Sequence, residues 1–175
     1  MAKWSDRGLT VAGQGRKGTR LDQLNDPKRI FIDGNDTLYI CDYMNHRVIS
    51  IDHEGFLYIA NWGNHCVVKW HKNANNGEIV AGGDGSGTGL DRLHLPSDAI
   101  VDTQSDGAFL VADTLNHRIL RFQLGSRMGA IIAGVGGKGS GDTELNSPLN
   151  LALDSQGNLY VSDSDNDRIQ MFPRI

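Results

Sequence analysis

The stretch Leu38-Tyr39-Ile40-Cys41-Asp42-Tyr43-Met44-Asn45-His46-Arg47-Val48 decides the fold, because similar stretches recur without gaps at 57–67, 109–119 and 159–169. Each copy has a short apolar run, a four-residue polar turn and a second apolar run. The runs are rich in leucine, tyrosine and β-branched residues, and Asp, Asn or Gly stand at the joints. The pattern predicts four β-hairpins.

Two further elements accompany the hairpins. Strand-like segments bounded by glycines stand at 8–13, 77–82 and 129–134. Each runs through a glycine-rich loop to a proline (Pro27, Pro96 or Pro148), and another apolar run follows the proline. The full repeat therefore has four short strands, a to d counted from the proline. Its spacing, 52 residues from Asn64 to Asn116 and 50 from Asn116 to Asn166, is typical of a β-propeller blade.

One interval is much shorter, since only 19 residues separate Asn45 from Asn64. The segment 49–52 fits both strand c of the first copy and strand a of the second, so we predict that one strand serves both copies. The predicted fold is all-β: an incomplete, propeller-like array of four-stranded antiparallel blades with the first two copies fused. The shared strand merges those copies into one sheet of up to six strands.

The chain 1–175 is predicted to be a single segment of this array. Its repeat cores are expected at about 27–52, 49–82, 96–134 and 148–172, with an N-terminal strand at 8–13. Both ends read as though cut from a longer array. We expect residues 8–12 to supply the strand d that the last copy lacks, and exposed sheet edges to favour self-association.

The turn motif resembles that of the NHL-repeat family. Asn-His-Arg stands at 45–47 and 116–118, an aspartate precedes each motif, and Leu-Asn-x-Pro stands at 24–27 and 145–148. Cys66 departs from the motif in the second copy, where arginine is expected, and Asp167 departs in the fourth, where histidine is expected. The resemblance implies a propeller that binds protein or RNA.

Successive strands alternate in direction, so the b–c turns and the d–a loops are predicted to share one face of the molecule. That face carries the least repeated side chains, and exposed aromatic residues dominate interface energetics. The predicted binding residues are Tyr43, Met44, His46, Trp62, His65, Leu115 and His117. The net charge of −4 favours a protein partner over nucleic acid. An RNA-binding propeller and a metal-dependent, lyase- or lactonase-like propeller enzyme remain the alternatives.

The sequence predicts no catalytic residue, no metal site and no cofactor. G-x-G-x-x-G occurs at 13–18 and 134–139, but a dinucleotide site needs a helix after this loop, and here a strand is expected. The acidic run that begins at Asp163 has arginine where a calcium loop requires glycine and glutamate. Turn histidines displayed once per copy lie too far apart to share a metal ion. No apolar run is long enough to span a membrane, and nothing indicates a compartment.

The turn residues also have predicted structural roles. The aspartates should accept hydrogen bonds from turn amides, and the asparagines should adopt positive φ. The arginines should pair with carboxylates of a neighbouring copy. These sets are Asp42, Asp113 and Asp163; Asn45, Asn116 and Asn166; and Arg47, Arg118 and Arg168. Cys41 and Cys66 are expected to be free thiols.

Overall fold

The computed structural model describes residues 7, 16–20, 23–32, 38–42, 45, 47–51, 56–71, 77–102, 104–105 and 107–175. Within these ranges the chain is all-β. Thirteen strands are joined by turns, three of which are single 3-10 turns: η2 (Trp62–Asn64), η3 (Thr114–Asn116) and η4 (Ser164–Asn166).

The first sheet is the merged sheet that the short interval predicts. Six antiparallel strands pair in chain order, from β1 at one edge to β6 at the other. They are β1 (Pro27–Ile32), β2 (Leu38–Asp42), β3 (Arg47–Ile51), β4 (Phe56–Asn61), β5 (Cys66–His71) and β6 (Glu78–Gly82).

Strand β3 is the shared strand. Ile49 in β3 is opposite Ile40 on one side and opposite Ile59 on the other, so β3 is paired along both edges. The prediction that the first two copies are fused through one strand is therefore confirmed.

The other two copies form separate sheets. The middle sheet has four strands, in the order β10-β9-β8-β7, and the last sheet has three, in the order β11-β12-β13. Their bounds are β7 (Asp98–Val101), β8 (Phe109–Asp113), β9 (Arg118–Phe122), β10 (Ala130–Ala133), β11 (Pro148–Leu153), β12 (Leu159–Asp163) and β13 (Arg168–Phe172). The fourth strand predicted for the last sheet, at 8–12, lies outside the described residues.

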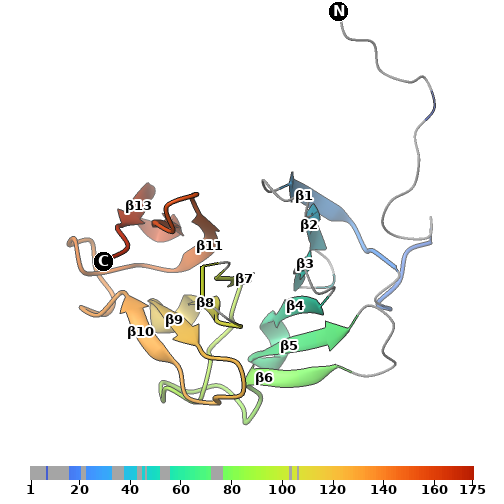
Figure 1. The fold of residues 1–175 in the computed structure, drawn as a ribbon, viewed down its shortest axis with the longest axis horizontal. Helices are drawn as coiled ribbons and strands as arrows, with labels where there is room; N and C mark the ends of the chain where they lie inside the picture. Colours follow the sequence, from blue (N-terminus) through green and yellow to red (C-terminus); the bar gives the residue numbers. More distant parts are fainter. Residues whose placement is uncertain are drawn as a thin grey trace, which may run out of the picture.

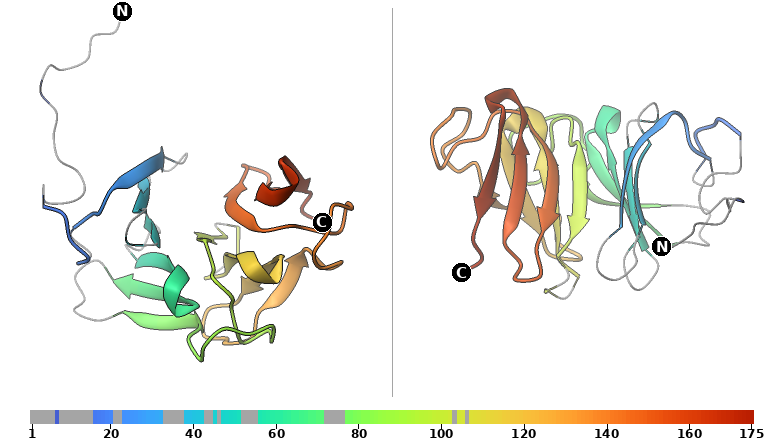
Figure 2. Two further views of the ribbon diagram at one scale, coloured as in Figure 1. Left: turned by 180° about the vertical axis from the view of Figure 1, so that it is seen from behind. Right: turned by 90° about the horizontal axis from the view of Figure 1, so that it is seen from above.

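The three sheets stand side by side in an arc that does not close (Figure 1). The end of the arc that carries β1 and the end that carries β13 are separated by an opening, which is also visible from behind and from above (Figure 2). The prediction of an incomplete, propeller-like array is confirmed. Strand β3 is also the first strand of the second copy, and β2 and β1 extend the sheet beyond it. The edge strand β1 therefore lies two strands away from β3.

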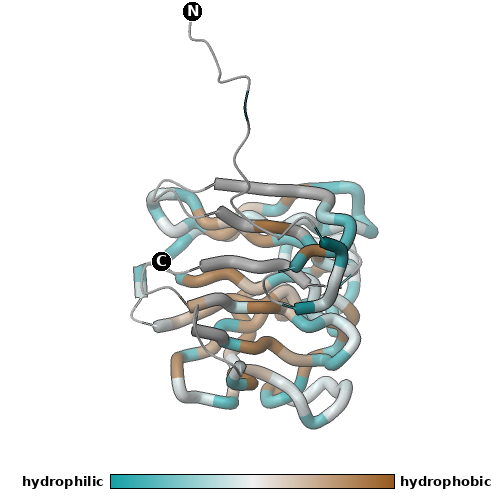
Figure 3. The backbone as a smooth tube through the Cα atoms, turned by 90° about the vertical axis from the view of Figure 1, so that its right-hand side faces the viewer, coloured by the Kyte–Doolittle hydropathy of each residue, from teal (hydrophilic) through white to brown (hydrophobic). Residues whose placement is uncertain are grey.

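Two apolar cores lie between the sheets. The first joins the six-stranded sheet to the middle sheet and includes Tyr58 and Phe109, whose ring centroids are 5.2 Å apart. The second joins the middle sheet to the last sheet and includes Ile119 and Val161. Figure 3 shows the consequence along the chain: apolar stretches follow the strands, whereas polar stretches gather at the turns.

Burial differs between the middle and last sheets. All five residues of β8 are buried, as expected for a strand covered on both faces. In β12 buried residues alternate with more exposed ones, because only one face of the last sheet is covered. Among the described residues, the middle sheet is therefore covered on both faces, whereas the last sheet is covered on one.

Candidate functional site

In the second, third and fourth copies, the turns that correspond to the repeated motif share one backbone geometry. The residue after each 3-10 turn is left-handed, with φ of 53° at His65, 54° at His117 and 52° at Asp167. Its N–H closes the turn, as when His117 donates to the Thr114 carbonyl at 3.1 Å. The prediction that the asparagines adopt positive φ is wrong by one position, because the asparagine is the last residue of the 3-10 turn.

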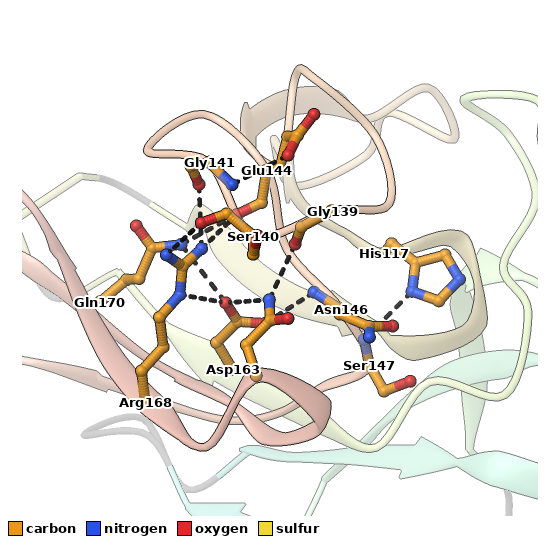
Figure 4. A network of polar contacts seen from close by, with 11 residues as sticks. His117, Gly139, Ser140, Gly141, Glu144, Asn146, Ser147, Asp163, Arg168 and Gln170 are labelled. Atoms are coloured by element: carbon orange, nitrogen blue, oxygen red, sulfur yellow. Dashed lines mark hydrogen bonds and ion pairs between the residues drawn. The ribbon is translucent and has the colours of Figure 1, made fainter.

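In the third and fourth copies, a buried aspartate carboxylate holds the turn to the loop that precedes the sheet. Asp113 accepts hydrogen bonds from the His94 backbone N–H at 2.6 Å, from Asn116 Nδ2 at 2.8 Å and from Arg118 Nε at 2.8 Å. Asp163 is held in the same way by Asn146, Asn166 and Arg168 (Figure 4). The backbone donor belongs to the loop that enters the sheet and not to the turn, which corrects the prediction.

The arginine pairs within its own hairpin. Asp113 and Arg118 are opposite each other across the β8–β9 ladder, so the ion pair closes the turn. The remaining nitrogens of Arg118 donate to the carbonyls of Thr88 at 2.8 Å and Gly89 at 2.7 Å. The prediction that these arginines pair with carboxylates of a neighbouring copy is therefore wrong for Arg118 and also for Arg168, which pairs with Asp163. Their role is to fasten the glycine loop to the turn.

The loop and the turn are also joined through asparagine. Asn116 Nδ2 donates to the Gly87 carbonyl at 2.7 Å, and Asn166 Nδ2 donates to the Gly139 carbonyl at 2.7 Å. Asn45 makes the equivalent bond to the Gly18 carbonyl at 2.8 Å. These contacts place turns and loops together on one face of the molecule, which we call the turn face.

The second copy lacks both charges of this network. Asn61 stands where the other copies have aspartate, and Cys66 stands where they have arginine. The merged sheet has no glycine loop ahead of this copy, so there are no loop carbonyls for an arginine to hold. Cys66 is a free, buried cysteine, and burial raises the pKa of its thiol. The substitution at Asn61 was visible in the sequence, as a second departure in the copy already marked by Cys66.

Two of the predicted binding histidines belong to the framework. His65 Nδ1 accepts a hydrogen bond from the Leu95 backbone N–H at 3.1 Å, and His117 Nδ1 accepts one from the Ser147 backbone N–H at 3.0 Å. Desolvation, followed by the charge of Lys138, lowers the pKa of His117. This favours the neutral ring that a nitrogen acceptor requires. Each histidine thus fastens its turn to the loop that enters the next copy.

Two exposed side chains at the tips of the turn face are large and apolar. Trp62 at the tip of η2 is 40% exposed, and Leu115 at the tip of η3 is 41% exposed. His94, which the sequence did not single out, lies edge-on to His65, with ring centroids 5.6 Å apart. The predicted binding residues Tyr43, Met44 and His46 lie outside the described residues. The structure therefore brings together four of the predicted residues, two at exposed tips and two in the framework.

The glycines of the G-x-G-x-x-G loop have a packing role. Gly134 has a φ of 78°, and a Cβ at this position would collide with the carbonyl oxygen of His117. Strand β11 follows the loop, where a dinucleotide site would need a helix. Among the described residues, no three His, Cys, Asp or Glu side chains are grouped closely enough to hold a metal ion. No helix in the described part of the chain is long and apolar enough to cross a membrane.

The loop, turn and strands of the last copy match a known family model. The NHL repeat model matches residues 145–172, which run from the buried Leu145 to the end of β13. Residues 145–172 are an NHL repeat. The turn of the third copy shares both the left-handed residue and the asparagine contact described above. A comparison with curated protein sequences gives no match.

Solved structures share the fold. An auxiliary nutrient binding protein from Bacteroides ovatus is 18% identical, with a TM-score of 0.56, over 84% of this chain and 48% of that one. A protein of unknown function from Bacteroides thetaiotaomicron is 15% identical, with a TM-score of 0.61, over 82% and 46%. A chain in a nidogen/laminin complex is 15% identical, with a TM-score of 0.58, over 89% and 66%. The NHL-type array thus spans about half the length of the bacterial structures that it resembles.

Proposed function

We propose that this NHL-repeat chain is a non-catalytic scaffold that binds a protein partner through its turn face. The observation that carries the proposal is that some turn residues hold the backbone in place while others are exposed. Asp113, Asn116 and Arg118 all bond to the chain itself, while Leu115 in the same turn and Trp62 in the preceding turn are exposed. A rigid frame that displays apolar tips is suited to a protein surface, because such tips gain affinity when a partner removes them from water.

The structural relatives support this proposal at the level of the fold. One is described as a nutrient binding protein, and another was solved in a nidogen/laminin complex. The net charge of −4 supports a protein partner over RNA, since RNA binding calls for a basic face.

Partner capture with a matched control tests the proposal. The wild-type chain, the Trp62→Ala/Leu115→Ala variant and the Leu124→Ala/Met128→Ala variant would each be cross-linked in an extract and compared by mass spectrometry. Leu124 and Met128 are somewhat more exposed than Trp62 and Leu115 but lie in the β9–β10 connection, at the opposite end of the strands. We expect the first variant to lose a partner that the control retains, with unchanged melting temperatures.

Two results would contradict the proposal. One is equal capture by all three chains. The other is binding of a single-stranded RNA oligonucleotide, measured by fluorescence anisotropy, that Trp62→Ala/Leu115→Ala weakens while protein capture is unchanged.

A further inference from the structure

The last sheet has an edge and a face that the middle sheet does not expose. In the middle sheet β10 covers the outer edge of β9, whereas among the described strands β13 is itself the outer edge. Ile169 in β13 is 68% exposed, although its counterpart Ile119 in β9 is completely buried. Tyr160 and Met171 are also exposed on this sheet. We call Tyr160, Ile169 and Met171 the open face.

The chain contains one more segment with the sequence of a fourth strand. Residues 8–13 read Gly-Leu-Thr-Val-Ala-Gly, and the segments that contain β6 and β10 read Gly-Glu-Ile-Val-Ala-Gly and Gly-Ala-Ile-Ile-Ala-Gly. In the two described copies the closing glycines, Gly82 and Gly134, have positive φ and touch the turn of the preceding hairpin. Gly13 closes the third copy of this pattern. The sequence thus supplies a fourth strand, and among the described residues the last sheet is the one that has three strands.

The loop that follows residues 8–13 restricts where the C-terminal end of this segment can lie. Lys17 bridges Leu24, as Ser86 bridges Leu93 and Lys138 bridges Leu145. Asn45 and Asp42 then hold this loop on the first hairpin, through the Gly18 carbonyl at 2.8 Å and the Asn25 N–H at 2.6 Å. Segment 16–20 is therefore tied to the β1 end of the arc, across the opening from β13 (Figures 1 and 2).

The pairing register excludes the chain's own β13 in this open arc. Gly82 is opposite Cys66, so by analogy Gly13 would lie beside Arg168. Only Gln14 and Gly15 separate Gly13 from Arg16, so the two Cα atoms are about 10 Å apart at most. Because segment 16–20 stands on the other side of the opening, β13 of another molecule is the edge that remains accessible.

We propose that residues 8–13 of one copy of this chain add to β13 of a second copy as its fourth strand. The pairing satisfies the backbone groups along the edge of β13. It also brings the donor's first hairpin against the open face. At two places in the chain, a fourth strand is followed by a glycine-rich loop and then by the next copy. In both cases the two successive sheets pack face to face around an apolar core. One occupant therefore covers both the edge and the open face.

A disulfide cross-link between separate chains tests the exchange. Ile79 is opposite Val68 and Ile131 is opposite Leu120, so the proposed register places Thr10 opposite Gln170. Directly opposed strand residues are close enough for a disulfide. A Thr10→Cys chain would be mixed with a size-tagged Gln170→Cys chain and oxidised mildly. The controls are the parent chain, which carries Cys41 and Cys66, and a Leu124→Cys chain in place of Gln170→Cys.

The expected product is the heterodimer of Thr10→Cys and Gln170→Cys, formed at least tenfold above either control. In parallel, sedimentation of the wild-type chain should show association that rises with concentration. Two outcomes would overturn the proposal: no heterodimer above the controls, or a Thr10→Cys/Gln170→Cys double variant that closes only within one chain. A chain that sediments as a monomer at every concentration would also overturn it.

Discussion

The middle and last sheets are built from the same repeat, yet the same positions have different surroundings in them. Leu110 and Ile119 of the middle sheet are buried against the last sheet, whereas their counterparts Tyr160 and Ile169 are exposed. The strands, turns and registers are equivalent. Burial of these positions is therefore determined by the neighbouring sheet and not by the strand itself.

The turn carboxylates show the same difference in their electrostatics. Asp113 and Asp163 are both inaccessible to solvent and accept equivalent hydrogen bonds. Desolvation raises the pKa of Asp113 despite its hydrogen bonds. Desolvation acts on Asp163 too, but hydrogen bonds from Asn146, Asn166, Arg168 and Gln170 outweigh it and lower the pKa. The two carboxylates thus differ in the neighbouring sheet that desolvates Asp113 and in the Gln170 hydrogen bond, which Leu120 cannot supply in the middle sheet.

The largest expected effect is one that the two sheets share. Val111→Asp and Val161→Asp each place a carboxylate in a core between sheets, where both valines are completely buried. An unpaired buried charge costs several kcal/mol, against a total stability of about 5–15 kcal/mol. We expect both variants to unfold at least their own sheet in urea melts followed by circular dichroism. If Val161→Asp alone were tolerated, the covered face of the last sheet would not be a true core.

The loss of the turn ion pair is expected to cost more free energy in the middle sheet than in the last sheet. Arg118 is nearly buried, so Arg118→Ala leaves an uncompensated carboxylate at Asp113, at a cost of about 3–5 kcal/mol. The Arg168 side chain is 28% exposed, and water can replace it at Asp163, so Arg168→Ala should cost about 1 kcal/mol. Urea titration measures both free energies. Equal losses would show that covering by a neighbouring sheet does not control the strength of this network.

Truncation of the equivalent isoleucines compares the covered face of the middle sheet with the open face of the last sheet. Ile119→Ala opens a cavity in the core and should cost about 2–4 kcal/mol. Ile169→Ala should change the unfolding free energy by less than about 0.5 kcal/mol in dilute solution, because the side chain is already exposed. A large loss for Ile169→Ala at low protein concentration would mean that the chain itself already covers the open face.

The last effect is a gradual change of stability with pH that originates in the middle sheet. Asp98 in β7 accepts N–H groups from Ala99 and from Leu151 of the last sheet, both at 2.8 Å, and burial raises its pKa from 3.8 to about 6. A raised folded-state pKa gives stability that is present below pH 3.8 and is lost as the pH rises through 6. The slope is at most about 1.4 kcal/mol per pH unit.

Asp98→Asn tests this slope, because asparagine occupies the equivalent position, Asn150, in the last sheet. As the pH rises from 4 to 7, the unfolding free energy of the variant should increase relative to that of the wild type. A constant difference between the two proteins over this range would show that Asp98 does not titrate there.

The sequence was sufficient to predict the strands and the fusion of the first two copies, but not the partners of the turn side chains. The hairpins, the shared β3 and the glycine-bounded β6 and β10 follow from local pattern and from the 19-residue interval. The pairing of Asp113 with Arg118 was also within reach, because residues that flank a four-residue turn are cross-strand partners. The inter-sheet contacts of His65 and His117 were not, since their partners lie 30 residues away and depend on how the loop folds back.

The shared strand β3 has a consequence for how such arrays change in length. In an antiparallel repeat of four strands, the first and third strands run in the same direction, whereas the second and fourth run in the opposite one. One strand can therefore replace a third strand, a fourth strand and the next first strand together without reversing the chain, since the net loss is two strands. A net loss of one or three strands would invert every later hairpin. Parity thus allows antiparallel repeat arrays to be shorter by half a unit, and the six strands β1–β6 are two fewer than two complete copies would have.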